Sequence, residues 1–511
     1  MSERLERLKE RMAQLSDLRH VSSLAHWDQQ TMMPPRGGAG RAESLATLER
    51  ISHELFVDDE TGRLLDGAAA ELNGAEPSSD DACLVRLVRR RWEKARRVPT
   101  ELAAEFARAA SVGQEAWVVA RETSDFAAFA PYLEHNFELV RRYVECHQGV
   151  DGYECAYDVV LDDYEPQMKT TAVAELFAEL KAELVPMMGR LIAAGDAVDD
   201  SLLHGDFPVE RQRPLVAEAV AMMGFDPSGW RMDDTVHPFA IGVGGGDVRI
   251  TTRWDQTYFP SSLYGAMHEC GHGLYEAGIP PSLARSPLGT GESLGMHESQ
   301  SRMWENMVGR GRPFCGVLAP RIAEILGGPL AGLEPDALYR AVNRVRPSFI
   351  RVESDEVTYA LHIVMRFELE QQLIEGTLAV KDLPEAWNTR FAQSFGIEVT
   401  DDANGVLQDV HWSAGLIGYF PTYALGNLIA GQLWERVHAD LPDLDIRIAA
   451  GDLKPLRDWL GEHVHRHGSK FTTSELLKRE AGGPISVRPF TTYLKRKLGD
   501  VYELDLAGPG D

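Results

Sequence analysis

Apolar side chains recur at spacings of three and four residues over most of this chain. At its start, Leu5, Leu8 and Met12 follow one another at these spacings, and Leu15 and Leu18 continue the series. Such spacing places the apolar side chains on one face of an α-helix. The same pattern runs through four longer segments, residues 131–148, 172–194, 356–375 and 422–438. The sequence therefore predicts a mostly α-helical fold.

Residues 237–258 depart from the helical pattern. Within them, residues 247–252 alternate in polarity and are partly β-branched, which predicts a β-strand. Three glycines at residues 244–246 indicate a turn before that strand, since a phosphate-binding loop would need a Gly-Lys-Ser/Thr run and a helix start after it. Residues 349–352 are a second short candidate strand. We therefore expect a small β-sheet beside the helices.

The length and charge of the chain narrow the classes of protein. On length alone, 511 residues would allow about three domains. However, no internal repeat and no long low-complexity linker separates one part of the chain from another. The formal net charge of -26 argues against nucleic acid as a partner, because nucleic-acid-binding proteins present a basic surface.

The cysteines and the first residues indicate the compartment. The five cysteines are irregularly spaced and form no C-x-x-C run, which is typical of reduced thiols in a cytosolic protein. The charged N-terminus lacks the apolar core of a signal peptide. No run of about 18 apolar residues could span a membrane. We therefore expect a cytoplasmic protein with no membrane partner.

The most specific motif lies at residues 268–272, which spell H-E-C-G-H and match the pattern H-E-x-x-H. Residues four apart share one face of a helix, so His268 and His272 can reach a single metal ion. Glu269 lies beside them and is a candidate general base. It would take a proton from a zinc-bound water, whose pKa the metal lowers to about 7. The motif predicts a zinc hydrolase with one ion per chain, a site that cobalt can also occupy. Two ordinary helix histidines are the simpler alternative.

The helix that holds this motif is predicted to be amphipathic. Ser261 and Ser262 are candidate N-caps, and Gly278 and Pro280 end the helix. The two histidines lie off its apolar stripe, so the helix can pack on one side and hold metal on another. Cys270 lies on the stripe and is predicted to be a core residue rather than a fourth ligand. The stripe consists of Leu263, Met267, Cys270, Leu274 and Ala277.

A third ligand is needed, because catalytic zinc takes three protein ligands and leaves a position for water. The third histidine of metzincins is absent, since Gly278 occupies its position. Glu276 would lie about 12 Å along the helix axis from the first histidine, so it is a poor ligand and is predicted to be a carboxylate behind the ligands or on the surface. Glu298 is the better candidate, on a second predicted helix over residues 291–308, and His297 is the fallback. Two histidines and a glutamate form the ligand set of thermolysin-type enzymes.

Five further motifs accompany H-E-x-x-H, and together they resemble the M32 family of metallocarboxypeptidases, the group of thermostable carboxypeptidase Taq, over nearly the whole chain. Two departures are visible: Ser354 replaces the alanine of the family's Arg-x-x-Ala-Asp, and Cys270 occupies a position where a less reactive residue is expected. Neither removes a chemical group that the mechanism needs. The motifs are residues 237–239 (HPF), 247–251 (DVRIT), 297–301 (HESQS), 350–355 (IRVESD) and 405–412 (GVLQDVHW).

The resemblance implies an almost all-helical fold like that of neurolysin and angiotensin-converting enzyme, with a deep central groove and a small β-sheet beside the active site. It implies a single peptidase domain over residues 1–511, with two helical lobes flanking the groove, and a homodimer. The implied activity is the removal of single amino acids from peptides with a free C-terminus, with broad specificity. His268, His272 and Glu298 match the family's metal ligands, and Glu269 matches its catalytic glutamate.

Two other functions stay open at this point. One is a helical oligopeptidase or dipeptidyl carboxypeptidase with the same metal chemistry. The other is a non-catalytic helical peptide-binding protein with a structural metal. The intact Glu269, and only three obvious protein ligands, argue against this second alternative.

Recognition of a peptide's α-carboxylate calls for an arginine, because its planar fork binds a carboxylate through two hydrogen bonds. Arg351 and Arg249 are the candidates, each inside a motif and on a candidate strand. An ordinary ion pair is the simpler alternative for both. His237 is a candidate to line the same end of the groove, and a core histidine is the alternative.

An oxyanion formed in peptide hydrolysis needs hydrogen-bond donors besides the metal. His411 and Tyr419 are the candidates, because similar helical metallopeptidases place a histidine and a tyrosine over the metal. A buried histidine and a core tyrosine are the alternatives, and Asp409 is a candidate to orient His411.

The groups that hold the metal histidines from behind are less evident. Thermolysin-like sites often carry an acidic residue one turn after the glutamate ligand. That position is Arg302 in this chain, so some other carboxylate, such as Glu305 or Asp355, would have to serve instead.

Overall fold

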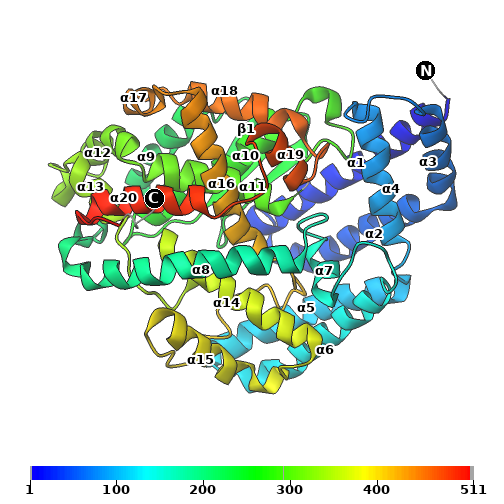
Figure 1. Ribbon diagram of the computed structural model, residues 1–511, viewed down its shortest axis with the longest axis horizontal. Helices are drawn as coiled ribbons and strands as arrows, with labels where there is room; N and C mark the ends of the chain where they lie inside the picture. Colours follow the sequence, from blue (N-terminus) through cyan, green and yellow to red (C-terminus); the bar gives the residue numbers. More distant parts are fainter. Residues whose placement is uncertain (1–2, 292, 507–511) are drawn as a thin grey trace. The chain divides into compact units, whose positions relative to one another are not determined.

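The structure is a computed structural model that describes residues 3–291 and 293–506. Helices account for most of these residues (Figure 1), which confirms the predicted mostly α-helical fold. The chain divides into two compact units, each built from three separate segments. Unit 1 comprises Met1–Arg96, Asp199–Val342 and Gln432–Pro484, and unit 2 comprises Arg97–Val198, Asn343–Gly431 and Ile485–Asp511.

Unit 1 contains the first four helices, the β-strands and the motif helix. Its described α-helices are α1 (Glu3–Thr31), α2 (Gly38–Val57), α3 (Asp59–Glu71), α4 (Asp80–Ala95), α9 (Val209–Met223), α10 (Pro260–Gly278), α11 (Leu294–Arg302), α12 (Arg312–Ile325), α13 (Pro335–Val342), α17 (Leu444–Ala449), α18 (Lys454–His463) and α19 (Thr473–Glu480). A π-helix, η5 (Met303–Gly309), continues α11 directly.

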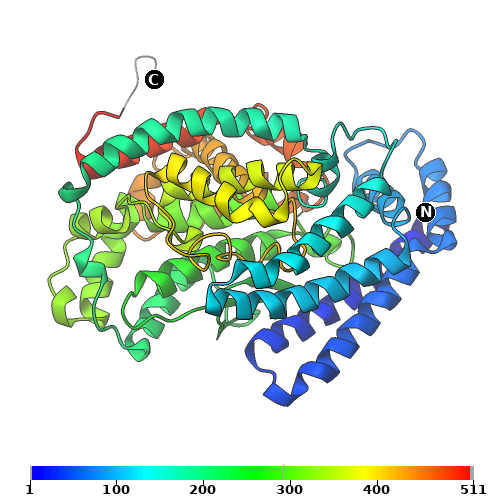
Figure 2. The ribbon, with the colours of Figure 1, turned by 90° about the horizontal axis from the view of Figure 1, so that it is seen from below.

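The helical spacing at the start of the chain produces one apolar core in unit 1. Leu5, Leu8 and Met12 of α1 are buried against apolar side chains of α3 and α4. Figure 2 shows α1 and α2 side by side, joined by a short segment that contains Pro34 and Pro35. The two prolines thus separate α1 from α2.

A three-stranded sheet in unit 1 supports the motif helix. The strands β1 (Trp230–Asp234), β2 (Ala240–Gly244) and β3 (Asp247–Thr252) lie in the order β1-β3-β2. β3 pairs parallel with β1 and antiparallel with β2, and helix α10 packs against β3 and β2. Gly244, Gly245 and Gly246 have φ values of 95°, 62° and 88°, a left-handed region that favours glycine, and form the turn before β3. The predicted strand and turn are both confirmed.

Unit 2 is helical over its described residues. Its helix α14 is buried along most of its length, including the polar side chains His362, Arg366 and Glu370. Helices α5 and α6 of this unit run side by side (Figure 2). The helices are α5 (Thr100–Thr123), α6 (Phe126–Glu145), α7 (Ala156–Leu161), α8 (Thr170–Ala193), α14 (Glu356–Glu375), α15 (Leu383–Phe395) and α20 (Arg488–Tyr502), while α16 (Pro421–Asp440) begins in unit 2 and ends in unit 1.

The prediction of a strand at residues 349–352 is wrong. The segment leads into a short 3₁₀ helix, Arg351–Glu353, and all three described strands of the sheet lie in unit 1. A strand needs a neighbouring strand for its backbone hydrogen bonds, and the described part of unit 2 offers none. The side chain of Gln408 serves instead: its Oε1 accepts from the backbone of Arg351, and its Nε2 donates to the carbonyl of Phe349.

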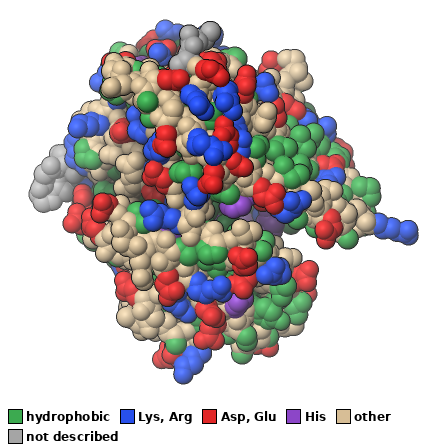
Figure 3. All heavy atoms as spheres, turned by 90° about the vertical axis from the view of Figure 1, so that its right-hand side faces the viewer, with side chains coloured by type: hydrophobic (Ala, Val, Ile, Leu, Met, Phe, Trp, Pro, Cys, Tyr) green, Lys and Arg blue, Asp and Glu red, His purple; other side chains and the backbone are tan. Residues whose placement is uncertain are grey.

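The surface carries charges of both signs. Figure 3 shows acidic and basic side chains intermixed on the face that it displays. Among the helices described, none combines the length and the apolar composition that a membrane span requires.

Candidate active site

The motif helix α10 begins one residue before the predicted N-caps. Pro260 occupies its first turn, where its fixed φ suits a helix start and its missing N–H costs nothing. Ser262 is instead buried, and its hydroxyl donates to the side-chain oxygen of Gln212 at 2.6 Å. The helix ends at Gly278 as predicted, and four of the five stripe residues are buried, whereas Ala277 is exposed.

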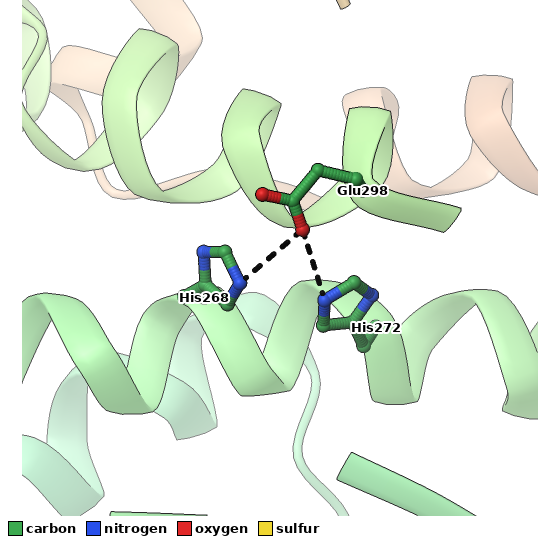
Figure 4. A group of neighbouring side chains, drawn as sticks. All are labelled: His268, His272 and Glu298. Carbon is green, nitrogen blue, oxygen red and sulfur yellow. Dashed lines mark ion pairs between the residues drawn. The ribbon is translucent and has the colours of Figure 1, made fainter. Parts of the chain in front are cut away.

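His268, His272 and Glu298 come together as a candidate metal site (Figure 4). The Nε2 atoms of His268 and His272 lie 3.5 Å and 3.4 Å from Oε2 of Glu298. One ligand atom from each residue lies within 4.8 Å of the others. Two imidazole nitrogens and one carboxylate oxygen are a donor set that suits zinc, so the residues present fit a divalent metal of this kind.

Gly271 allows the two ligand-bearing helices to approach closely. A Cβ atom at this position would lie 2.8 Å from Cα of Ser301 and 2.9 Å from the carbonyl oxygen of Gln300. Both are backbone atoms of α11, so they cannot move away as a flexible side chain could. The glycine inside the motif thus lets α10 and α11 pack at the distance that brings Glu298 to the histidines.

Glu305 holds His268 from behind, as one of the two predicted alternatives. Its Oε2 lies 2.8 Å from Nδ1 of His268, and its Oε1 accepts from Arg310 at 3.0 Å. Arg302 donates to Oε1 of Glu298 at 2.6 Å and lies 3.4 Å from Glu305. Burial alone would raise the pKa of Glu305, but the hydrogen bond with His268 and the two guanidinium groups lower it well below its usual range. Glu305 is therefore a carboxylate that accepts the imidazole N–H.

Asp355, the other alternative, serves a different purpose. It caps helix α14 in unit 2, where its side chain accepts from the backbone N–H groups of Val357 and Thr358.

His297, the predicted fallback ligand, lies behind His272. The Nδ1 atoms of these two rings are 2.8 Å apart, and Nε2 of His297 lies 2.8 Å from Oε1 of Glu276. Sequence reasoning assigned no partner to either Glu276 or His297. Their positions, one turn after one ligand and immediately before another, are the signal that could have pointed to them.

Glu269 is buried beside the ligands, with 7% of its surface exposed. Burial raises the pKa of its carboxyl to about 7, although the neighbouring His268 acts in the opposite direction. A cation bound nearby would lower this pKa, because it favours the charged form. A carboxyl that titrates near neutrality can take up and release a proton during a reaction cycle.

Arg249 is engaged with groups of its own unit. It donates from Nε and Nη2 to the two oxygens of Asp247, both at 2.8 Å, and its guanidinium lies 4.3 Å from the ring centre of Trp27. Arg231, its partner in the β1–β3 register, lies over the same ring at 4.7 Å. His237 lies between β1 and β2 and is exposed, so it is not a core histidine.

Arg351 lies in a buried charge cluster of unit 2. It donates to Oδ1 of Asp409 from Nη2 at 2.8 Å and from Nε at 3.0 Å, and to the hydroxyl of Tyr359 at 2.8 Å. Arg366 donates to the other oxygen of Asp409 at 2.7 Å. Burial opposes the charge of Asp409, but the two guanidinium groups hold the pKa of this carboxyl well below its usual range. Two buried cations thus share one carboxylate.

His411 and Tyr419 lie next to each other in unit 2, with ring centres 5.3 Å apart. Burial lowers the pKa of His411 to about 3, so its imidazole is neutral near pH 7. Nε2 of His411 lies 3.0 Å from the hydroxyl of Tyr423, a residue that sequence reasoning missed although it follows Tyr419 by four residues. Asp409 lies 3.8 Å from Nδ1 of His411, too far for a hydrogen bond.

Two histidines and a glutamate, with a second glutamate beside them, are the residues of a metallohydrolase site, and comparison of this sequence with known proteins gives the same class. The chain belongs to the Carboxypeptidase Taq (M32) metallopeptidase family, because the sequence model of that family matches residues 7–498. The class predicted from the motifs is thereby confirmed.

Two similar proteins are thermostable carboxypeptidase 1 of Thermus thermophilus and carboxypeptidase 1 of Bacillus subtilis. The first is 42% identical over 95% of this chain and 96% of the relative, and the second is 37% identical over 96% and 97%. Among solved structures, the M32 carboxypeptidase of Deinococcus radiodurans R1 matches with a TM-score of 0.93 at 37% identity, over 98% of this chain and 100% of the other. The fold is therefore that of the M32 carboxypeptidases.

Proposed function

We propose that this chain is a metal-dependent carboxypeptidase that removes single amino acids from peptides with a free C-terminus, with broad specificity. The observation that carries the proposal is the cluster of His268, His272 and Glu298 with the buried Glu269 beside it. Membership of a metallopeptidase family, and relatives named carboxypeptidases, support the same activity.

The proposed cofactor is one Zn²⁺ ion per chain, held by His268, His272 and Glu298, with Co²⁺ as an ion that can replace it. Two imidazoles and a carboxylate are the ligand set of catalytic zinc in thermolysin-type sites. Zinc in such a site polarises the scissile carbonyl and lowers the pKa of a bound water.

Glu269 is the proposed general base and acid. Its carboxylate takes a proton from the water that attacks the scissile carbonyl carbon, and then gives that proton to the departing amine. Its burial beside His268 supports this role, because burial raises the pKa of the carboxyl while a bound cation would lower it, and the two effects oppose each other. Glu305 and Arg302 keep the ligands His268 and Glu298 oriented while the proton moves.

Arg351 is the first candidate for binding the substrate's α-carboxylate. The cluster around it holds two guanidinium groups and one carboxylate, so it has an excess of positive charge that an anion can neutralise. Arg249 is the second candidate and would have to give up its paired hydrogen bonds to Asp247. His237, which is exposed, is the third candidate for substrate contact.

His411 and Tyr419 are the proposed donors to the oxyanion. A neutral imidazole and a phenol can each donate one hydrogen bond to a developing negative charge. The lowered pKa of His411 supports the neutral form that this role requires.

We further propose a cytoplasmic homodimer in which residues 1–511 form one peptidase domain. The five cysteines are free, which suits a reducing compartment. Apolar side chains exposed on α1, on α2 and just after α1, namely Val21, Leu24, Ile51 and Met32, support a contact between two copies.

Product analysis of the metal-loaded enzyme tests this function. Peptides with free and with amidated C-termini are incubated with the protein, and the products are identified by mass spectrometry. We expect single residues to be released in order from the free C-terminus and amidated peptides to stay intact. Dipeptide products or internal cuts would contradict the proposal and favour a dipeptidyl carboxypeptidase or an oligopeptidase.

A further inference from the structure

The two metal-ligand histidines are held from behind in different ways. Nδ1 of His268 lies 2.8 Å from a carboxylate oxygen of Glu305. Nδ1 of His272 lies 2.8 Å from another imidazole, that of His297, whose far nitrogen lies 2.8 Å from Glu276. The second arrangement is therefore a hydrogen-bond chain of three residues, in which the imidazole of His297 lies between His272 and the carboxylate of Glu276.

When His297 is neutral, the chemistry of the three residues fixes the direction of both hydrogen bonds. The carboxylate of Glu276 can only accept, so Nε2 of His297 donates to it. A neutral His297 then has a lone pair at Nδ1, which accepts the N–H at Nδ1 of His272. The remaining nitrogen of His272, Nε2, is left with its lone pair and faces Oε2 of Glu298 at 3.4 Å. The chain thus prepares His272 in the tautomer that a metal ion needs.

The three residues of this hydrogen-bond chain come alternately from helices α10 and α11. His272 and Glu276 lie one turn apart on α10, whereas His297 immediately precedes the ligand Glu298 on α11. Successive residues of a helix point about 100° apart, so His297 can lie at Nδ1 of the His272 ring while Glu298 lies at its Nε2. One short segment of α11 therefore provides both a ligand and the group that orients another ligand.

Neighbouring side chains hold His297 in place. The ring of Tyr275 lies 4.9 Å from it, and Tyr275 in turn lies 5.2 Å from the buried His465. Nε2 of His465 lies 2.9 Å from the side-chain oxygen of Gln300 on α11. With only 18% of its side chain exposed, His297 is positioned by packing as well as by Glu276.

We propose that His297 is a positioning residue that sets the tautomer and orientation of His272 and thereby the affinity of the site for its metal, with Glu276 fixing His297. This inference rests on the proposed metal site. It assigns His297 a place behind a ligand instead of the role of a ligand. Groups that orient metal-bound histidines typically change metal affinity about 10–100-fold when they are removed.

The test compares Zn²⁺ affinity in the full chain, measured by competition with a chromophoric chelator, for the wild type, His297→Leu and His297→Asn. Leucine removes the acceptor, so we expect a loss of affinity of about 10–100-fold. Asparagine offers an amide oxygen at nearly the position of Nδ1, so we expect it to restore most of the affinity. His204→Leu, at a histidine of the same unit with 47% of its side chain exposed, is the matched control and should leave affinity unchanged.

Two further measurements separate positioning from a general loss of structure. Thermal unfolding of the metal-free proteins should show little difference between His297→Leu and His297→Asn, while their Zn²⁺ affinities differ. The visible absorption of the Co²⁺-loaded proteins should show that the number of protein ligands is unchanged, since His297 is not itself a ligand.

The outcomes distinguish this inference from the function on which it rests. Stoichiometric Zn²⁺ binding by the wild type, with equal affinity in His297→Leu, would overturn the inference alone. Failure of asparagine to restore affinity would also overturn it. If the wild type bound no stoichiometric ion, the proposed metal site would be wrong as well.

Discussion

Oε2 of Glu305 lies 2.8 Å from Nδ1 of His268, although Glu305 follows the other carboxylate of the site, Glu298, by seven residues. The π-helix η5 that contains Glu305 continues α11 directly. Arg302 lies between the two carboxylates in sequence and donates to Glu298, with its other end 3.4 Å from Glu305. A cation thus occupies the expected acidic position, and the acidic group follows it by three residues.

Replacing Glu305 with glutamine should weaken metal binding. The amide can donate as well as accept, so it no longer enforces an N–H at Nδ1 of His268. We expect metal affinity and kcat/KM to fall about 10–100-fold, measured by chelator competition and peptide hydrolysis. Glu324→Gln, on the exposed surface of α12, should change neither quantity. Equal affinity in both variants would show that Glu305 does not orient the ligand.

Replacing Glu269 with glutamine should abolish most activity without removing the metal. The amide cannot take a proton from water, and general-base catalysis typically contributes about 10²–10⁴-fold to the rate. Metal content and kcat are measured on the same preparation, so a loss of kcat with full metal content identifies the base. Unchanged peptide hydrolysis in Glu269→Gln would refute the proposed mechanism.

Replacing Gly271 with alanine should destabilise the site, whereas the same change at Gly265 on the same helix should not. A Cβ at Gly271 meets backbone atoms of α11 at 2.8 Å and 2.9 Å, but one at Gly265 meets only the hydroxyl of Thr252 at 3.8 Å. Overpacking typically costs about 1–3 kcal/mol, while alanine is favoured over glycine in a helix by about 1 kcal/mol. Urea unfolding and Zn²⁺ affinity check both effects; equal stability of the two variants would contradict the close-packing argument.

The two candidate arginines can be separated by conservative substitution. Lysine keeps the charge but loses the planar fork that binds a carboxylate. We expect Arg351→Lys to raise KM for peptides with a free C-terminus and to reduce the preference over amidated peptides by about tenfold or more, as the loss of about 1.4 kcal/mol would do. Arg249→Lys should leave that preference intact, because Arg249 has both oxygens of Asp247 to itself, whereas Arg351 shares Asp409 with Arg366. The reverse result would assign substrate binding to Arg249.

Glu370 should make the stability of the protein fall as the pH rises toward 7. Its buried carboxyl accepts from the hydroxyl of Tyr157, the indole of Trp412 and the backbone of Gly418. Burial nevertheless raises its pKa to about 7. Between the unfolded and the folded pKa the native state binds more protons, so this contribution is complete below the unfolded pKa and is lost as the pH passes the folded one.

The Glu370 contribution amounts to roughly 3 kcal/mol over that range. In Glu370→Gln this dependence should disappear, so urea unfolding between pH 5 and pH 8 should show a flatter profile than in the wild type. Glu368→Gln, at a more exposed position two residues earlier, serves as the control. Parallel profiles in Glu370→Gln and the wild type would contradict the predicted titration.

Much of the site follows from local spacing. Residues four apart share a helix face, which predicts that His268 and His272 meet one metal, and the second helix was expected to bring Glu298 to them. The strand at residues 247–252 followed from alternation in the same way. The strand predicted at residues 349–352 failed because a strand depends on a distant partner, and local composition cannot reveal whether one exists.

The sequence by itself determined the helical fold and the family, and it selected the residues of the candidate metal site, because these depend on residue type and on spacing along one chain. Only the tertiary structure decided what stands behind each ligand. Whether Glu305, Asp355 or another group reaches His268, and on which side of His272 the ring of His297 lies, depends on how α11 and η5 rotate and pack against α10. That rotation is set by contacts such as the close approach at Gly271, which arise only when helices distant in sequence meet.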